Sequence, residues 1–412
     1  MTDKRQITSA DIYYLAIAIY VLAHNIHLSY AYTQWAASRS IILTVIKGLR
    51  YISYGLCILR LFCLRRVNQA YIWIGALLLC GSVVATATGT ANSPIFYFLF
   101  FMAGIHIDFK KIVKVFFAIQ ATTFILYVVC GLTGIIGGET IVQTGRTRAF
   151  LGYGWVNRAA YCLLFMTFEY LYIVDFKLRI LPAVLISAAN LFVYIKTVTF
   201  FPFAITFAVI ILGLLYNYSW RRKRHSRILK ALFKGKTLSF YYIVTIVIGA
   251  ILPLIYNPGN ALWYALNKAV TGRLALAQRA IQKYGLHIWG NKIEWVGSST
   301  LLFGLSQSKE YNYVDAGFLN LALEFGILFV GIIACIYFKS IVTAKSKHDD
   351  AMLLCLYVLF ALFIFEPYVI DFAFNPFPLY YISTLGYLRI GLKKRESIEN
   401  YSCRPNGLEK DL

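Results

Sequence analysis

Apolar runs of about twenty residues recur along almost the whole chain, and they constrain the fold more than any other feature. A run such as VFFAIQATTFILYVVCGLTGII, at 115–136, has the length that an α-helix needs to cross about 30 Å of hydrocarbon. Of the 412 residues, 59% are hydrophobic and 14% are charged, which a soluble domain does not need. No segment alternates like a membrane β-barrel strand. These patterns predict an all-α, polytopic integral membrane protein, with residues 1–412 as a single transmembrane domain.

We expect about twelve membrane-spanning helices. Span four is short enough to be re-entrant, and spans seven and eight could instead form one hairpin that enters the membrane only partly. The apolar stretch of the first span is not followed by a small-residue cleavage site, so the span is expected to be retained. The expected spans are 11–30, 41–62, 71–88, 94–108, 112–133, 157–174, 179–195, 198–217, 238–256, 316–338, 351–370 and 376–391.

Lysine and arginine between the spans predict the orientation, because positive residues are enriched on the cytoplasmic side. With both termini in the cytoplasm, Arg65 and Arg66, the basic loop 218–237 and the tail 392–412 all lie on that side. The same orientation places two loops outside, the Arg/Gly loop 134–156 and the large loop 257–315. Membrane orientation therefore accounts for the net charge of +22 without a nucleic-acid partner.

Known motifs for other chemistries are missing from the sequence. The eight cysteines form no CxxC pair and indicate neither a disulfide framework nor a metal site. The sequence has no HExxH, P-loop, GxGxxG or sugar-nucleotide signature, so we expect no metal ion, nucleotide or other cofactor.

Residues 145–158, which run from the Arg/Gly loop into the start of the next span, read GRTRAFLGYGWVNR and have three arginines and no carboxylate. Positive residues are unusual on the outer side, so Arg146, Arg148 and Arg158 need a partner there. Each alone is more simply explained by lipid phosphates or by a carboxylate of another loop. Three together, in a loop whose glycines let the backbone approach a ligand, favour an anion site.

The large outer loop contains TGRLALAQRAIQKYGLHIWGNK. Thr271 is suited to begin a helix and Gly285 to end it. Apolar residues at 274, 277, 281 and 284 share one face, so we expect an amphipathic helix lying on the membrane surface. Arg273 and Arg279 are either solvated cations or reach one site along the edge of this helix. The excess of positive charge in the loop predicts a cavity that attracts phosphate groups.

Asp315 precedes span ten, where it either caps the helix or faces the arginines as a general base or sugar ligand. Within the spans, charged side chains are expected to face the bundle or a wet cavity. For Lys47 and Arg50 the default expectation is pairing with Glu169 or Glu324; Glu366 is also intramembrane. The histidines at 24, 27 and 287 are more often packed than catalytic.

Taken together, these residues resemble bacterial polysaccharide repeat-unit polymerases of the Wzy type, within the O-antigen ligase and polymerase superfamily. RAFLGYGWVN is similar to the family's arginine, glycine and asparagine turn, matching Arg148, Gly152 and Asn157. GRLALAQRAIQKYGLHIWG resembles its loop helix. VDAGFLNLALEFG resembles the opening of the next span, with Asp315 where ligases tend to have histidine; the usual following asparagine is Ala316 here.

The resemblance implies polymerisation of undecaprenyl-diphosphate-linked oligosaccharides on the outer face of the bacterial cytoplasmic (inner) membrane. It implies membrane lipids, a flippase and a chain-length regulator as partners. The reaction needs neither metal nor cofactor, because the diphosphate is already an activated leaving group. We expect Arg148, Arg273 and Arg279 to stabilise the diphosphate and Asp315 to act near the acceptor. Expected substrate-binding residues are Arg146, Asn157, Arg158, Lys47, Arg50 and His287.

Three other functions remain open at this point. A flippase for lipid-linked glycans would also have about twelve spans and cationic cavity residues, but it would not need so large an outer loop. An O-antigen ligase is disfavoured only by Asp315 in place of histidine. An ion-coupled transporter ranks last, because the sequence shows neither an inverted repeat nor paired broken helices.

Overall fold

The computed structural model describes most of the chain. The described residues are 8–37, 41–64, 69–88, 93–136, 139–143, 145–222, 235–304, 310–372 and 374–385. The expected cytoplasmic Arg65 and Arg66, most of the basic loop 218–237 and the whole tail 392–412 lie outside the described residues.

The described chain is mostly helical, as expected. Most expected spans coincide with a helix to within a few residues. The long helices are α1 (Ser9–Leu28), α3 (Ile41–Phe62), α4 (Gln69–Thr88), α6 (Phe109–Leu132), α7 (Arg158–Ile173), α8 (Ile180–Thr197), α9 (Phe200–Arg221), α11 (Gly235–Ile255), α15 (Gly317–Ser346) and α16 (Asp350–Phe363). The shorter elements are α2 (Tyr30–Ala37), α5 (Ser93–Ala103), β1 (Thr140–Gln143), β2 (Arg146–Ala149), α12 (Ala261–Ala269), α13 (Arg273–Tyr284), α14 (Ser298–Leu302), the 3₁₀ turn Phe377–Leu379 and α17 (Tyr380–Thr384).

Six of the described helices are long and apolar enough to cross a membrane: α1, α6, α8, α9, α11 and α15. Apolar stretches in α4, α5 and α16 are shorter. The chain is thus a multi-pass membrane protein, whereas the count of twelve spans stays a prediction. The eleventh expected span is too long, because α16 ends at Phe363 and not at 370. Pro367, which lacks an N–H and disfavours a helical residue before it, lies in the irregular segment that follows.

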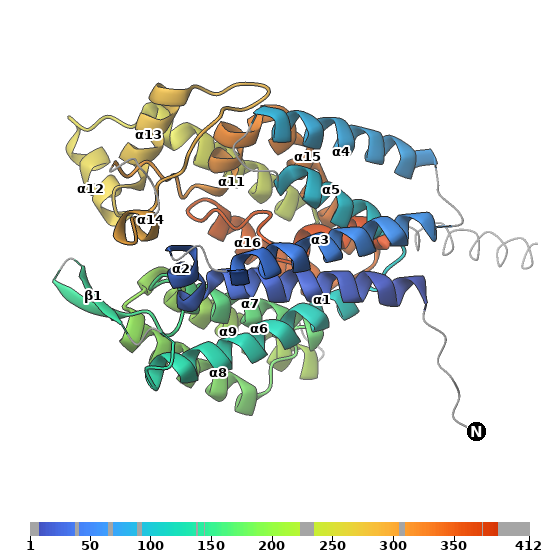
Figure 1. The fold of residues 1–412 in the computed structure, drawn as a ribbon, viewed down its shortest axis with the longest axis horizontal. Helices are drawn as coiled ribbons and strands as arrows, with labels where there is room; N and C mark the ends of the chain where they lie inside the picture. The colour runs from blue at the N-terminus through green and yellow to red at the C-terminus, as the bar shows by residue number, and fades with distance from the viewer. Residues whose placement is uncertain are drawn as a thin grey trace, which may run out of the picture.

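The two expected outer loops lie at the same end of the helix bundle (Figure 1). The hairpin of β1 and β2, which pairs Gln143 with Arg146, projects at the end of the bundle that also holds α2 and α12 to α14. Helix α1 begins at the opposite end, and α1, α3 and α6 run side by side between the two ends. The hairpin was not expected in an all-α fold; it is a local addition to the helical bundle.

The amphipathic helix of the large loop exists as α13, and Gly285 ends it as expected. Thr271 does not cap it: Gly272 is the N-cap, and both residues have left-handed backbone angles because the chain turns sharply after α12. The apolar face of α13 is covered by the protein itself, and the expected position on a membrane surface stays a prediction. Ala277 is buried and Ile281 and Tyr284 are partly buried, and they pack against apolar residues of the same protein: Ile293, Val314, Leu319 and Leu323.

Helix α15 is broken at Gly326, whose φ of 88° and ψ of 162° are not helical. The large loop fills the break: the N–H groups of Ile327 and Leu328 donate to the carbonyls of His287 and Ile288 at 3.1 and 3.2 Å. In return, Asn291 donates its N–H to the Glu324 carbonyl at 3.1 Å. The loop thereby satisfies backbone groups that the break leaves without a helical partner, and it is fixed to the bundle.

Replacing Gly326 by alanine should destabilise the protein by about 3 kcal/mol or more. A Cβ at this position would collide with the Ile288 carbonyl and with Gly290, and the backbone angle already disfavours any side chain. Gly331→Ala in the same helix is the matched control, because nothing lies within 4 Å of a Cβ there. The measurement is the thermal unfolding midpoint of each variant in detergent; equal midpoints for the two variants would contradict this role of Gly326.

Candidate functional site

A polar cavity of about 400 Å³ lies where the hairpin loop, the large loop and the segment after α16 meet. Its lining comes from segments far apart in the sequence. The lining residues are Leu28, Trp155, Asn157, Arg158, Arg273, Trp295, Gly297, Ser298, Ser299, Thr300, Tyr311, Tyr313, Asp315, Glu366, Pro367, Tyr368, Asp371 and Phe374. Of the predicted site residues, the cavity brings together four: Asn157, Arg158, Arg273 and Asp315.

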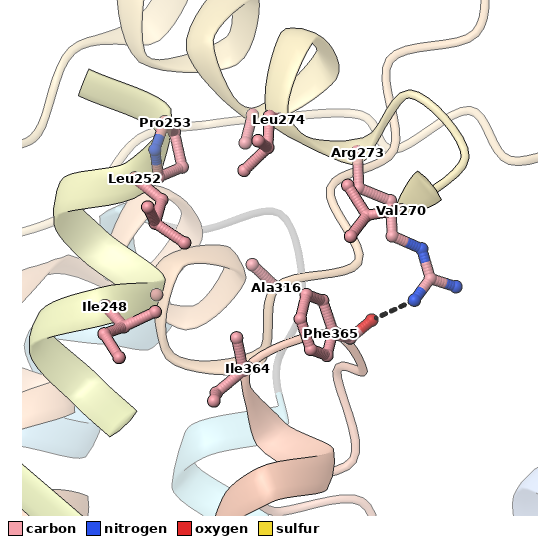
Figure 2. A pocket seen from close by; sticks show the side chains of 11 residues that line it. Ile248, Leu252, Pro253, Val270, Arg273, Leu274, Ala316, Ile364 and Phe365 are labelled. Atoms are coloured by element: carbon pink, nitrogen blue, oxygen red, sulfur yellow. Dashed lines mark hydrogen bonds between the residues drawn. The ribbon is translucent and has the colours of Figure 1, made fainter. Parts of the chain in front are cut away.

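Arg273, the first residue of α13, is clamped between two carboxylates. Its Nε lies 3.2 Å from Asp315 Oδ2, and its Nη2 lies 2.8 Å from Glu366 Oε1. Its Nη1 donates to the carbonyl oxygen of Phe365 at 2.8 Å, the bond drawn in Figure 2 beside a small apolar pocket between α11 and α13. Each of its three nitrogens thus has a partner, and two carboxyls face its charge, so Arg273 holds the two carboxylates in place.

Both carboxyls of this clamp have pKa values above those of ordinary carboxyls. Burial raises the pKa of Glu366 to about 7, against the opposing effect of Arg273 and with a further increase from Asp315. Burial also raises the pKa of Asp315, again opposed by Arg273. Burial alone would lower the pKa of Arg273, but Glu366 and Asp315 outweigh it and raise that pKa. The clamp therefore contains one permanent cation and two carboxyls, of which Glu366 exchanges its proton near neutral pH.

Asp315 is not the cap of α15, since Ala316 holds that position without a side-chain hydrogen bond. Asp315 instead faces an arginine, Arg273, which was the alternative expectation for it. Asp315 is half-buried, with about a fifth of its side chain exposed to the cavity. This geometry leaves Asp315 able to contact a ligand while Arg273 holds it.

Arg158 begins α7 and is the second arginine of the cavity. Its Nη1 donates to the carbonyl of Leu28, at the end of α1, at 3.2 Å. Within the described part of the chain it has no carboxylate at ion-pair distance, unlike Arg273. Gly154 makes room for it, because a Cβ there would lie 2.9 Å from Arg158 Nη1 and 2.6 Å from Thr33 Oγ1. Arg158 is thus a cavity cation whose remaining donors can bind a ligand.

Aromatic rings form much of the cavity wall. They come from both loops and from the segment after α16: Trp155, Trp295, Tyr311, Tyr313 and Tyr368. Trp295 is fixed by a 2.8 Å hydrogen bond from its Nε1 to Glu324 and by Tyr313, whose ring centroid lies 5.7 Å away. Flat apolar faces next to carboxylates suit a ligand that is apolar on its faces and carries hydroxyls at its edge, which describes a sugar ring.

The expected strongly positive cavity is not what the structure contains. Two arginines, Arg158 and Arg273, stand against three carboxyls, Asp315, Glu366 and Asp371. None of the other described lysines and arginines of the two loops lines the cavity, so the charge count of a loop does not predict the charge of its cavity.

The remaining predicted residues lie outside the cavity lining. Arg148 is half-buried in β2 and donates from Nε to the Thr197 carbonyl at 2.7 Å and from Nη2 to Thr199 Oγ1 at 3.1 Å, so it secures the hairpin to the end of α8. Arg148, Arg273 and Arg279 therefore do not share one site. The others are exposed on the hairpin, α13, the turn after it and α3, namely Arg146, Arg279, His287 and Lys47.

The default expectation for the intramembrane charges is wrong at Glu169, which accepts from Gln120 Nε2 at 2.8 Å and not from Lys47 or Arg50. Arg50 lies on α3, where its Nε and Nη2 atoms are buried. Sequence reasoning also missed Glu366, Asp371 and the tyrosines as cavity residues. The available signal was EPYVID at 366–371, where two acids and a proline interrupt an apolar run.

Among the described residues, no group of three or more His, Cys, Asp or Glu side chains is arranged to hold a metal ion. Comparison of the chain with models of protein families, with curated proteins and with solved structures found no match. The cavity itself is therefore the basis for a functional assignment.

Proposed function

We propose that the protein polymerises lipid-diphosphate-linked oligosaccharide repeat units into a surface polysaccharide. The observation that carries the proposal is the cavity, which combines aromatic walls, carboxyls and a guanidinium without a carboxylate partner among the described residues, at the end of a membrane bundle. The first two suit sugar rings and their hydroxyls, and the guanidinium suits a phosphate. A membrane-embedded bundle suits a substrate whose head group sits at the interface while its chain stays in lipid.

The reaction joins two such substrates. The acceptor hydroxyl forms a bond to the anomeric carbon of the donor glycan, while the bond from that carbon to the diphosphate oxygen breaks. The electron pair leaves with the lipid diphosphate, here undecaprenyl diphosphate, and the hydroxyl proton passes to a carboxylate. The leaving group is already activated, so the proposal includes neither a nucleotide nor a metal ion.

Each cavity residue has a role in this proposal. Arg158 stabilises the charge that develops on the departing diphosphate, as a preorganised donor does in an oxyanion hole. Asn157 and Asp315 contact the glycans, and Glu366 accepts the proton of the acceptor hydroxyl. Arg273 positions both carboxyls. Arg148 and Arg279 were expected at the diphosphate as well, and the cavity geometry favours Arg158 for that role.

The proposed location is the bacterial cytoplasmic membrane, with the cavity on its outer face and both termini inside. Two observations support this orientation: the two long loops share one end of the bundle, and α1 begins at the other. A flippase that delivers the lipid-linked units and a protein that sets chain length are the proposed partners.

The experiment is deletion of the gene, followed by sizing of the surface glycan. Loss of this polymerase should leave single repeat units at the surface. Loss of a ligase would instead leave polymer on the lipid carrier, and loss of a flippase would leave little surface glycan. Purified protein should also elongate lipid-linked units extracted from the deletion strain, in excess chelator. Polymer of normal length in the deletion strain would rule the proposal out.

A further inference from the structure

The packed face between α1 and α3 changes character toward the end of the bundle that holds the cavity. On α3, buried residues follow a helical stripe at Ile46, Ser53, Tyr54 and Cys57, and Ser53 Oγ donates to the Ala16 carbonyl of α1 at 2.6 Å. Arg50 falls on this stripe, one turn from Ile46 and from Tyr54. A guanidinium therefore occupies a position where the rest of the interface is apolar or hydrogen-bonded.

The facing stripe of α1 becomes polar at the same level. Ile17 and Tyr20 are buried, and the next residues along the stripe are His24 and His27. The two imidazole centroids lie 5.8 Å apart, and that of His24 lies 5.7 Å from the Tyr20 ring. The charge of Arg50 acts on both imidazoles, which places the three side chains in one cluster.

Four polar atoms of this cluster are buried without a hydrogen-bond partner: Arg50 Nε, Arg50 Nη2, His24 Nδ1 and His27 Nδ1. In the described part of the chain, Arg50 also has no carboxylate at ion-pair distance. Buried polar groups are almost always paired, and an uncompensated arginine inside a membrane bundle is costly. Four unpaired buried polar atoms in one cluster therefore indicate a binding site for a ligand.

The identity of the free atoms indicates the class of ligand. Nε and Nη2 form one edge of the guanidinium, whose two parallel N–H groups match two oxygens of an oxyanion. Each imidazole can add an N–H from Nδ1 in the tautomer that carries its proton there. An anion that uses two oxygens on Arg50 and a third on an imidazole needs at least three oxygens, which a phosphate group has and a carboxylate does not.

We propose that Arg50, His24 and His27 bind a phosphate group between α1 and α3. The site adjoins the cavity: His24 Nε2 lies 4.0 Å from Asp371 Oδ1 of the cavity lining, and the charge of Arg158 also acts on both imidazoles. A phosphate that enters this site would either displace Asp371 from His24 or share His24 with it. The inference goes beyond the proposed function, because it requires no glycan and holds for a lipid head group or for free phosphate.

Binding to the full-length protein in nanodiscs of zwitterionic lipid tests the proposal. The probes are farnesyl diphosphate, inorganic pyrophosphate and farnesol, measured by calorimetry. We expect the wild type to bind farnesyl diphosphate, and Arg50→Gln to weaken that binding about tenfold or more. Arg50→Lys should retain part of the affinity, since it keeps the charge but loses the two-pronged edge. Lys196→Gln removes an exposed cation from α8 and should bind like the wild type.

The probes also separate the two sources of phosphate. Tighter binding of farnesyl diphosphate than of pyrophosphate assigns the site to a lipid head group, and equal binding assigns it to soluble phosphate. Should Arg50→Gln not fold, the double variant His24→Gln, His27→Gln gives the same readout. The proposal is overturned if the wild type binds neither anion, if farnesol binds as tightly as its diphosphate, or if both variants bind like the wild type. None of these measurements depends on polymerisation, so a failure of the proposed function and a failure of this phosphate site can be told apart.

Discussion

Arg158→Ala is expected to lower the rate of glycan elongation about 10²- to 10³-fold, the effect of removing one preorganised donor from a developing charge. The reason is that Arg158 lines the cavity, and its side-chain hydrogen bond to the Leu28 carbonyl leaves other donors for the diphosphate. Arg158→Lys should recover part of the rate, because lysine keeps the charge and loses the fork. The measurement is the turnover of purified variants on lipid-linked units, at matched protein levels.

Arg148→Ala is the informative comparison, since the sequence singles out that arginine. Its guanidinium already binds the Thr197 carbonyl and Thr199, so its loss should act through the hairpin and cost less than the loss of Arg158. Lys268→Ala, an exposed cation of α12, controls for the general charge of the outer end. If Arg148→Ala is inactive while Arg158→Ala elongates normally, the assignment from the cavity is wrong and the one from the sequence is right.

Elongation by the wild type is expected to increase with pH and level off above about 7, and Glu366→Gln should remove this dependence. Burial raises the pKa of Glu366 to about 7, so the carboxyl is protonated below that pH and cannot accept a proton from the acceptor. The groups that face it are Arg273, Asp315, Tyr161, Tyr311 and Tyr368, and the tyrosines stay neutral in this range. Glu366→Gln should also lower the plateau about 10²- to 10⁴-fold, the usual contribution of a general base.

The matched control is Glu310→Gln, which neutralises a carboxyl that is 80% exposed and 3.9 Å from Lys283 on the outer surface. Its pH profile should match that of the wild type. Asp315→Asn tests the other member of the clamp. If the rise near pH 7 survives in Glu366→Gln and disappears in Asp315→Asn, Asp315 is the proton acceptor and Glu366 only supports it.

Membrane class and helix positions could be predicted from the sequence because both depend on local properties. The length and apolarity of a run decide whether it can cross a bilayer, and α3 begins and ends where its run does. Glycine at 285 ends α13 for an equally local reason, its tolerance of a left-handed backbone. The break at Gly326 was not predictable in this way, because its hydrogen bonds go to the large loop about forty residues earlier.

The composition of the site was decided by the tertiary structure. In the sequence, Arg148 and Arg158 are similar cations of one glycine-rich stretch. In the fold, Arg148 donates to a carbonyl and a hydroxyl, whereas Arg158 lines the cavity. From the sequence, Arg273 could be a free cation, but the fold brings Asp315 and Glu366 to it from distant segments. The sequence also places Glu366 within a membrane span, whereas α16 ends before it. Local chemistry determines which residues can act; only the packing of distant segments determines which of their charges are already neutralised, and hence which are left for a ligand.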